Sequence, residues 1–169
     1  MRYVIDACNL IFRDRRLDDT LERHGFRAAR TMLAEMLMRF ARAERLEEIV
    51  AVFDGSEKAE HRPRMQREAL GKVVFIYADP REEADKCIVD LVESAPRPGQ
   101  ITVVSSDKAL VRQVQQAQGH HLSCRDFLRH MKEALKRAAD PLRGEDPRKF
   151  SGPLTQREVE EWSKWFRKA

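Results

Sequence analysis

Four short runs of apolar residues, rich in β-branched and aromatic side chains, recur along the first two thirds of the chain. None of them alternates apolar with polar positions. Unbroken runs of this length are typical of strands covered on both faces, as in a parallel sheet with helices above and below it. We therefore expect buried strands at Tyr3–Ile5, Ile49–Phe53, Val73–Tyr77 and Ile101–Val104.

Between and after these runs, apolar residues recur at helical spacing. This spacing predicts helices over residues 28–43, about 81–95, after Asp107 and over about 126–139, with a short fifth strand near His121–Ser123. Strands that alternate with helices in this order predict an α/β fold of three layers, with a mostly parallel central sheet of about five strands and right-handed crossovers. Residues 56–71 are polar and strongly basic, and no regular element is expected there.

The amino-acid composition of the sequence changes at Asp140. Residues 141–153 are rich in proline and glycine, which predicts an extended arm. Thr155 and Glu158 then form a capping box at the start of an amphipathic helix that carries Trp162 and Phe166 on one face. We therefore divide the chain into an α/β domain at 1–139 and an arm with a C-terminal helix at 140–169. That helix either packs on its own domain or docks on a partner.

Composition narrows the class of protein. The 169 residues are 42% hydrophobic and contain no apolar stretch long enough to cross a membrane, and the chain begins as a strand and not as a signal peptide, so a cytoplasmic protein is expected. Lys and Arg number 32 against 28 Asp and Glu, with a pI near 9.1, which suits a polyanionic partner. The three cysteines form no CxxC pair and are expected to be buried thiols, and none of the five histidines has a metal-ligand spacing.

Acidic residues stand at nearly every strand exit of this predicted fold. Asp6, Asp54 and Asp107 follow three of the strands, Asp126 follows the fifth, and Glu83 and Asp85 open a helix. The carboxyl ends of parallel strands meet at one edge, where these carboxylates would repel one another unless they bind cations. Each alone could instead be a helix cap or a turn residue. Their conjunction predicts a metal-dependent enzyme, with Asp85 a stronger ligand candidate than Glu83 because the two lie on opposite flanks of the helix.

Basic residues flank two of these acidic positions and are the candidates for contacts with phosphate. They are Arg13, Arg15 and Arg16 after Asp6, and Lys58, Arg62, Arg64 and Arg67 after Asp54. In a chain that is 36% charged, solvated charged faces explain such clusters equally well.

Five segments, taken together and in order, resemble a known family. MRYVIDACNLIFR, AVFDG, EEADKCI, ITVVSSDKALVRQV and HHLSCRDFL resemble the NYN domains of the YacP-like group, within the PIN and 5′-nuclease-like superfamily. The resemblance spans roughly residues 2–132. It implies a PIN-like sheet and endonucleolytic hydrolysis of RNA with Mg²⁺ or Mn²⁺. RNA, free or in a ribosome-associated context, is therefore the expected partner. It assigns catalysis and metal binding to Asp6, Asp85 and Asp107, supporting roles to Asn9 and Ser105, and an outer position to Asp54.

Two departures from the family pattern bear on the metal site. Ala109 and Lys86 stand where related chains often carry a further acid. The acidic set then supports one tightly bound ion and a weak second one, or it recruits Asp126 as a replacement. A noncatalytic RNA- or ribosome-binding module with a degenerate metal site is the alternative. A phosphotransferase of the haloacid dehalogenase type is disfavoured, because Cys8 stands where its DxD motif requires an acid.

Overall fold

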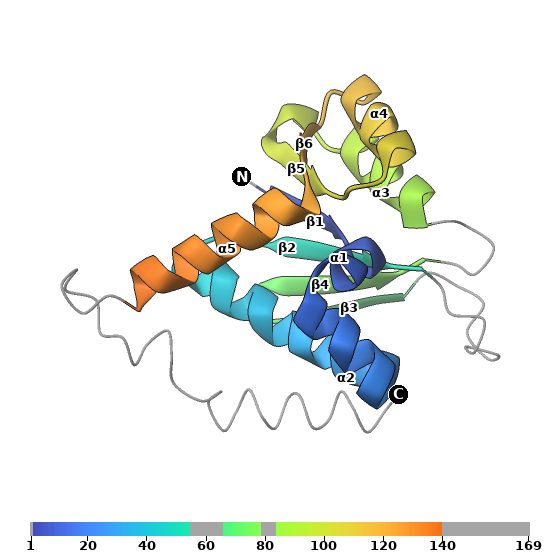
Figure 1. Cartoon of the computed structure of the whole chain (residues 1–169). Coiled ribbons are helices and arrows are strands. Elements are labelled where there is room, and N and C mark those ends of the chain that lie inside the picture. The colour runs from blue at the N-terminus through green and yellow to red at the C-terminus, as the bar shows by residue number, and fades with distance from the viewer. Residues whose placement is uncertain (1, 55–65, 79–83, 140–169) are drawn as a thin grey trace.

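The computed structural model describes residues 2–54, 66–78 and 84–139. Its elements alternate along the chain as in an α/β protein (Figure 1). They are β1 (Arg2–Asp6), α1 (Ala7–Arg13), α2 (Arg15–Ala43), β2 (Ile49–Phe53), β3 (Gln66–Leu70), β4 (Val73–Tyr77), α3 (Ala84–Glu93), the 3₁₀ turn η1 (Pro98–Gln100), β5 (Ile101–Val104), α4 (Lys108–Gln116), β6 (His120–Leu122) and α5 (Cys124–Ala138).

The strands form one sheet in the order β3-β4-β2-β1-β5-β6. Neighbouring strands run parallel throughout, except that β3 pairs antiparallel with β4. The predicted α/β class and mostly parallel sheet are confirmed. The described strands number six where about five were expected.

The additional strand is β3, which lies at the end of the basic segment for which no element was expected. A two-residue turn at Gly71 and Lys72 joins it to β4, and Gly71 adopts the positive φ of 58° that such a turn requires. Backbone pairing with β4, from Gln66 opposite Tyr77 to Leu70 opposite Val73, holds this edge strand in place. The sequence QREAL lacks an apolar run because an edge strand is not buried on both faces.

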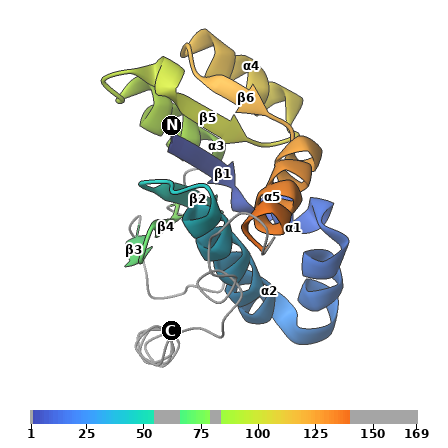
Figure 2. The ribbon, with the colours of Figure 1, turned by 90° about the vertical axis from the view of Figure 1, so that its left-hand side faces the viewer.

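Helices cover both faces of the sheet and create two hydrophobic cores (Figure 2). Tyr3 and Ile5 of β1 contribute to the core shared with α1, α2 and α5, whereas Val4 contributes to the core under α3 and α4. The same alternation continues in β2 and β4. Because both faces are covered, the strands are apolar without a break, which is why the pattern identified them.

The N-terminal helical region is longer than the spacing predicted. Helix α1 was not expected, and α2 begins at Arg15 and not near residue 28. Asp14 caps α2 by accepting hydrogen bonds from the amides of Arg16 (2.9 Å) and Leu17 (3.2 Å), so a highly charged stretch starts as a helix. Gly25, with φ 81° and ψ 173°, interrupts α2 and separates this charged half from the apolar half.

The C-terminal elements of the domain differ from expectation by one or two residues. Strand β6 covers His120–Leu122, and α5 begins at Cys124, two residues earlier than expected, because Ser123 is its N-cap. The arm and helix predicted at 140–169 lie outside the described residues. None of the described helices is long and apolar enough to span a membrane.

Candidate acidic active site

The topology places a crevice at the carboxyl end of β1. From β1 the chain crosses to β2 on one side, while β5 lies on the other side of β1. Ligands of open α/β sheets bind where the strand order reverses in this way. Asp6 is the last residue of β1, and Ser105 follows the last residue of β5, so the two side chains approach from neighbouring strands.

Asp6 is buried, with 7% of its surface exposed. Its Oδ1 accepts a hydrogen bond from the Asn9 amide (3.0 Å), and its Oδ2 accepts one from the Ser105 hydroxyl (2.9 Å). Burial raises the pKa of Asp6, these two hydrogen bonds lower it, and the negative charges of Asp54 and Asp107 raise it further. The carboxylates predicted to converge at this edge therefore act on one another electrostatically.

Asp107 is joined to Asp6 through one hydroxyl. The Ser105 Oγ that donates to Asp6 also accepts a hydrogen bond from the Asp107 amide (3.1 Å). The Asp107 side chain caps α4, since its Oδ1 accepts from the amides of Ala109 (2.6 Å) and Leu110 (3.1 Å). Both roles considered for Asp107, helix cap and site carboxylate, are thus compatible, because the capping bonds use one oxygen of two.

Asn9 ties the first helix to the far side of the crevice. Its side-chain oxygen accepts hydrogen bonds from the Ser106 amide (3.2 Å) and from the thiol of Cys124 (3.3 Å). Ser106 Oγ in turn accepts from the Cys124 amide (3.3 Å). Asn9 therefore connects α1 with the segment after β5 and with the start of α5.

Asp54 flanks the crevice on the β2 side. Its Oδ1 accepts a hydrogen bond from the amide of Ala84, the first residue of α3 (3.2 Å), which brings the neighbouring half-buried Asp85 to this side. The pKa of the Cys8 thiol is raised to about 11. Burial is the largest cause, a hydrogen bond with the Asp54 backbone opposes it, and the charges of Asp54 and Asp6 add to it.

Asp126 is engaged elsewhere. Its Oδ2 accepts from Ser123 Oγ (2.6 Å) and its Oδ1 from Arg129 (2.6 Å), so it completes the cap of α5. Across residues 2–54, 66–78 and 84–139, no three His, Cys, Asp or Glu side chains converge closely enough to form a ready metal site. Glu83 lies outside these residues. The structure thus groups Asp6, Asn9, Ser105 and Asp107 directly and Asp54 electrostatically.

The candidate RNA-binding residues occupy different surroundings. Arg13 ends α1, and its positive charge acts on the thiol of Cys124, next to Asn9. Arg15 and Arg16 form ion pairs with Asp19 (4.0 Å) and Asp14 (3.7 Å). On β3, Arg67 contacts Glu48 (3.3 Å), the residue before β2 and at the opposite end of that strand from Asp54. Lys58, Arg62 and Arg64 lie outside the described residues.

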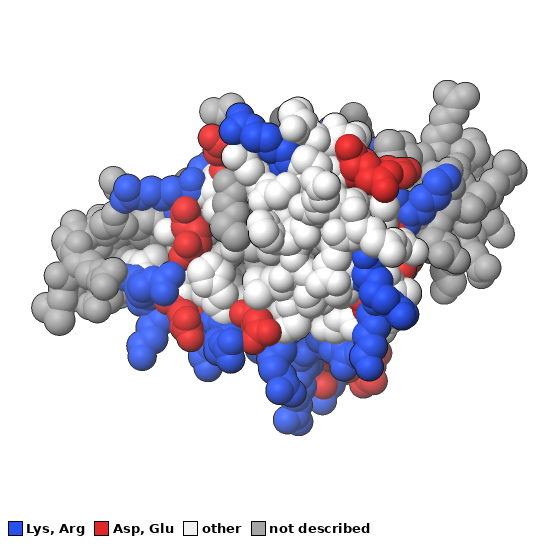
Figure 3. Space-filling model, turned by 90° about the horizontal axis from the view of Figure 1, so that it is seen from above, with Lys and Arg blue, Asp and Glu red and all other residues white. Residues whose placement is uncertain are grey.

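Figure 3 shows how charge is distributed on the upper face of the molecule. Lys and Arg gather around its rim, with Asp and Glu among them and uncharged surface in the centre. Among the residues that the structure describes, positive charge is therefore not collected into one continuous patch on this face.

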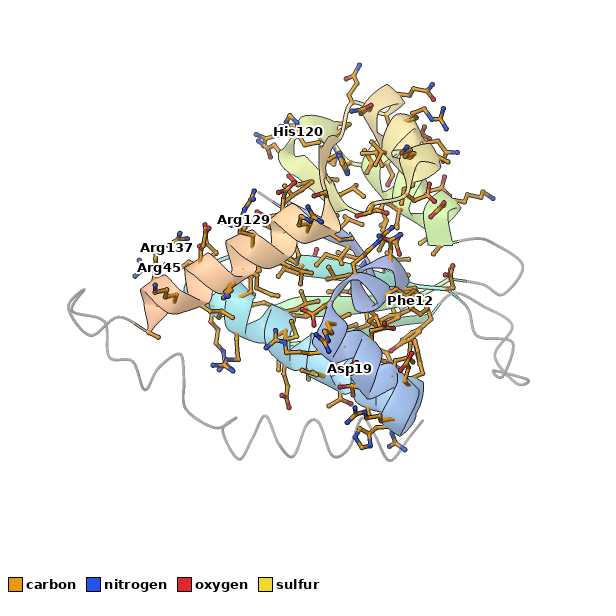
Figure 4. All side chains as sticks on the ribbon, in the orientation of Figure 1. Phe12, Asp19, Arg45, His120, Arg129 and Arg137 are labelled. Carbon is orange, nitrogen blue, oxygen red and sulfur yellow. The ribbon has the colours of Figure 1, made fainter. Side chains whose placement is uncertain are left out.

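Two residues to which the sequence assigned no role lie near the crevice. His121 Nε2 is 2.9 Å from the backbone oxygen of Ser105; a carbonyl only accepts, so this nitrogen is the donor. Phe12 of α1, labelled in Figure 4, follows Asn9 by one helical turn. Its side chain is exposed, with a relative exposure of 62%. The alternation of side chains along a strand predicts that His120 and His121 point to opposite faces of the sheet. It does not predict that His121 contacts Ser105, because that contact depends on the register of β6 with β5, which no local pattern encodes.

Comparison with known proteins gives a consistent result. Among curated proteins, none matches the sequence. Two crystal structures of Rae1 (YacP) from Bacillus subtilis, one of them of a point mutant, are similar in fold. The mutant has a TM-score of 0.65 at 22% identity, covering 95% of this chain and 89% of that one. The unmutated protein has a TM-score of 0.65 at 19% identity, covering 99% and 95%.

The family resemblance is confirmed over more of the chain than residues 2–132. A sequence model of the YacP-like NYN domain matches residues 3–167, and so includes most of the segment separated above at residue 140. This chain therefore belongs to the family of YacP-like NYN domains, which are nuclease-like and RNA-related.

Proposed function

We propose that this protein is a divalent-metal-dependent endoribonuclease that hydrolyses phosphodiester bonds of RNA at the carboxyl end of β1. The observation that carries the proposal is the hydrogen-bonded set of Asp6, Ser105 and Asp107. The carboxylate of Asp6 is buried, and the negative charges of Asp54 and Asp107 raise its pKa. Burying mutually repelling carboxylates costs stability, and a bound cation offsets that cost. Family membership supports the same class of activity.

The donor set suits Mg²⁺ or Mn²⁺. Both are hard cations that prefer carboxylate oxygens and water, and Mg²⁺ keeps several waters when one or two carboxylates hold it. Each carboxylate oxygen can accept two bonds, so Asp6 retains acceptor capacity beyond Asn9 and Ser105, and Asp107 Oδ2 takes no part in capping α4. Asp6 and Asp107 would hold the cation, with Asp85, Asp54 and Glu83 as the remaining candidates.

Such a cation supplies positive charge that activates water for attack on phosphorus and offsets the charge that develops there. The chain itself does the positioning. The hydroxyl of Ser105 holds the side chain of Asp6 and the backbone amide of Asp107 in place. The side chain of Asn9 holds the backbone of Ser106 next to α1. Arg13 at the end of α1 supplies positive charge beside the site for the RNA backbone.

One observation favours the alternative of a noncatalytic RNA-binding module. The described acidic side chains do not converge as a ready three-ligand group. Ala109 and Lys86 are consistent with a weakened metal site. Metal-dependent cleavage separates the two functions, because a pure binding module has no need of it.

The test is cleavage of labelled single-stranded and structured RNAs with Mn²⁺, Mg²⁺ or EDTA, by wild type and by Asp107→Asn. Asparagine caps helices as well as aspartate does, so the free energy of unfolding of the variant should lie within about 0.5 kcal/mol of that of wild type. The variant loses the negative charge toward the cation. We expect cleavage to fall at least about 100-fold, which corresponds to roughly 3 kcal/mol of lost transition-state stabilisation.

Asp14→Asn is the matched control, because Asp14 caps α2 through the same pair of amide bonds but stands at the start of a different helix. It should cleave like wild type. Cleavage by Asp107→Asn at the wild-type rate, or wild-type cleavage that persists in EDTA, would refute the assignment.

A further inference from the structure

A hollow of about 460 Å³ lies beside the acidic crevice, between α4 and β6. These two elements lie side by side at the β6 edge of the sheet (Figure 2). Ser106, Lys108, Val111, Arg112, His121 and Ser123 line it. Ser106 and Lys108 are the immediate chain neighbours of Asp107, so the hollow begins where the acidic crevice ends.

The charge of the hollow is opposite to that of the crevice. Of the six described residues that line it, Lys108 and Arg112 are cationic and none is acidic. The Nε of Arg112 donates to the Lys108 carbonyl (3.2 Å), which folds the guanidinium back beside Lys108 and uses only one of its five donor hydrogens. Two cations that line the same hollow suit a phosphate group.

Two of the residues that line the hollow suit contact with a planar base. Val111 and the ring of His121 are half-buried. The bond from His121 Nε2 to the Ser105 carbonyl (2.9 Å) holds the ring in place before any ligand arrives. Flat bases stack on such rings with little dependence on sequence. A hollow with a fixed ring, an aliphatic side chain and two cations combines the groups that contact the base and phosphate of one nucleotide.

We propose that this hollow is a nucleotide subsite for the RNA substrate. The ribonucleotide that neighbours the scissile phosphodiester places its base against Val111 and His121 and its outer phosphate beside Lys108 and Arg112. The inference rests on the proposed function for the identity of the substrate. It explains how an acidic crevice receives a polyanion, since the attraction comes from the adjoining surface.

The first experiment measures binding without cleavage. A single-stranded oligoribonucleotide is titrated in Ca²⁺ at several salt concentrations against wild type and Lys108→Ala/Arg112→Ala. Single-stranded nucleic acid gives a salt slope of about 0.7 per phosphate contact, so the double variant, which loses the contact with one phosphate, should lower the slope by about 0.7. At saturating RNA in Mn²⁺ its kcat should stay near wild type while KM rises, because these contacts are the same in ground and transition states.

Lys72→Ala/Lys136→Ala is the matched control. It removes two positive charges from exposed residues, one in the turn before β4 and one near the end of α5. Its salt slope should equal that of wild type.

Val111→Asp is a further variant that tests the hollow. A carboxylate in the hollow should repel phosphate and weaken RNA binding more than the loss of the two cations does. The melting temperature of Val111→Asp shows whether this variant is folded.

The second experiment locates the base. The same oligoribonucleotide, carrying one 4-thiouridine, is cross-linked to wild type by light and the protein is digested with trypsin. Cross-links should appear on peptide 109–112, which contains Val111, or peptide 113–125, which contains His121. Cross-links confined to other peptides, or a double variant that binds with the wild-type salt slope, overturn the subsite.

These outcomes are distinct from failure of the proposed function. RNA cleavage by wild type together with an unchanged double variant leaves the nuclease assignment standing and removes the subsite. Cross-links in the hollow without any metal-dependent cleavage retain the subsite on a protein that only binds RNA. A wild-type protein that binds no RNA overturns both.

Discussion

At the scale of single residues, the hydroxyl of Ser105 makes the closest link between two strand ends. It donates to Asp6 and accepts from the amide of Asp107, and the side chain is fully buried. A hydroxyl can serve both groups at once because it has one donor and two acceptor positions. The orientation of the acidic site therefore depends on an uncharged residue.

Ser105→Ala should test this dependence. The change leaves one oxygen of Asp6 and one backbone amide without their partner, which should cost roughly 1–3 kcal/mol of unfolding free energy. The pKa of Asp6 should rise further, since the hydrogen bond from Ser105 lowers it. Urea denaturation measures the first effect, with Ser94→Ala, at an exposed position after α3, as the control. A Ser105→Ala protein as stable as that control would contradict the role.

The sequence predicted the positions of Asp6, Asp54 and Asp107 because strand ends in a parallel sheet can be read from apolar runs. It predicted less well which groups touch. The bonds of Ser105 to Asp6 and of His121 to Ser105 depend on the register of β1, β5 and β6. Register is set by packing across the whole sheet, so these contacts are not visible in any local pattern.

At the scale of elements, α3, α4 and β6 meet at Gly119. A Cβ added there would lie 2.9 Å from Val92 Cγ1 and 3.0 Å from Val114 Cγ1, so the backbone itself fills the space between the two helices. Gly119 directly precedes β6, so this close approach holds the start of β6 against Val92 of α3 and Val114 of α4.

Gly119→Ala should accordingly destabilise the protein by about 1–3 kcal/mol, the usual cost of overpacking a core. Gly99→Ala is the matched control, since the nearest atom to a Cβ at that position is 3.9 Å away. Thermal unfolding of the two variants compares them directly. Equal melting temperatures would show that the valines move aside without cost.

The same scale shows where apolar patterning is a poor guide. Strand β3 and the first half of α2 were both missed, and both are rich in charge. Strand β3 is stabilised by its backbone pairing with β4. The first half of α2 is stabilised by the Asp14 cap and by burial of Leu17. Neither interaction requires an amphipathic stripe. The central strands, buried on both faces, were predicted almost to the residue.

At the scale of the whole molecule, the metal-free protein holds a buried carboxylate whose pKa is raised by burial and by like charges. The folded state then binds the proton of Asp6 more tightly than the unfolded state does. Unfolding free energy therefore falls as pH rises from the ordinary pKa of aspartate, about 3.9, through the folded pKa, and the loss is complete above it.

We expect Mn²⁺ to raise the melting temperature more at pH 8 than at pH 5, because protons compete with the cation at low pH. At a Mn²⁺ concentration 100 times the dissociation constant, binding adds about 2.7 kcal/mol to the free energy of unfolding. Asp6→Asn should raise the metal-free melting temperature at pH 8 and abolish the response to Mn²⁺. Shifts of equal size at both pH values would count against a carboxylate site.

The central place of β1 in the sheet also bears on how the molecule fluctuates. Strand β1 pairs with β2 and β5 and has helices over both faces, whereas β6 pairs with β5 alone and its residues are partly exposed. Segments with few buried contacts open locally, and central strands open only when the whole domain unfolds. Asp6 is thus anchored in the strand that we expect to open last, whereas the edge strand β6 should open at a lower free energy, a difference that amide hydrogen exchange would measure.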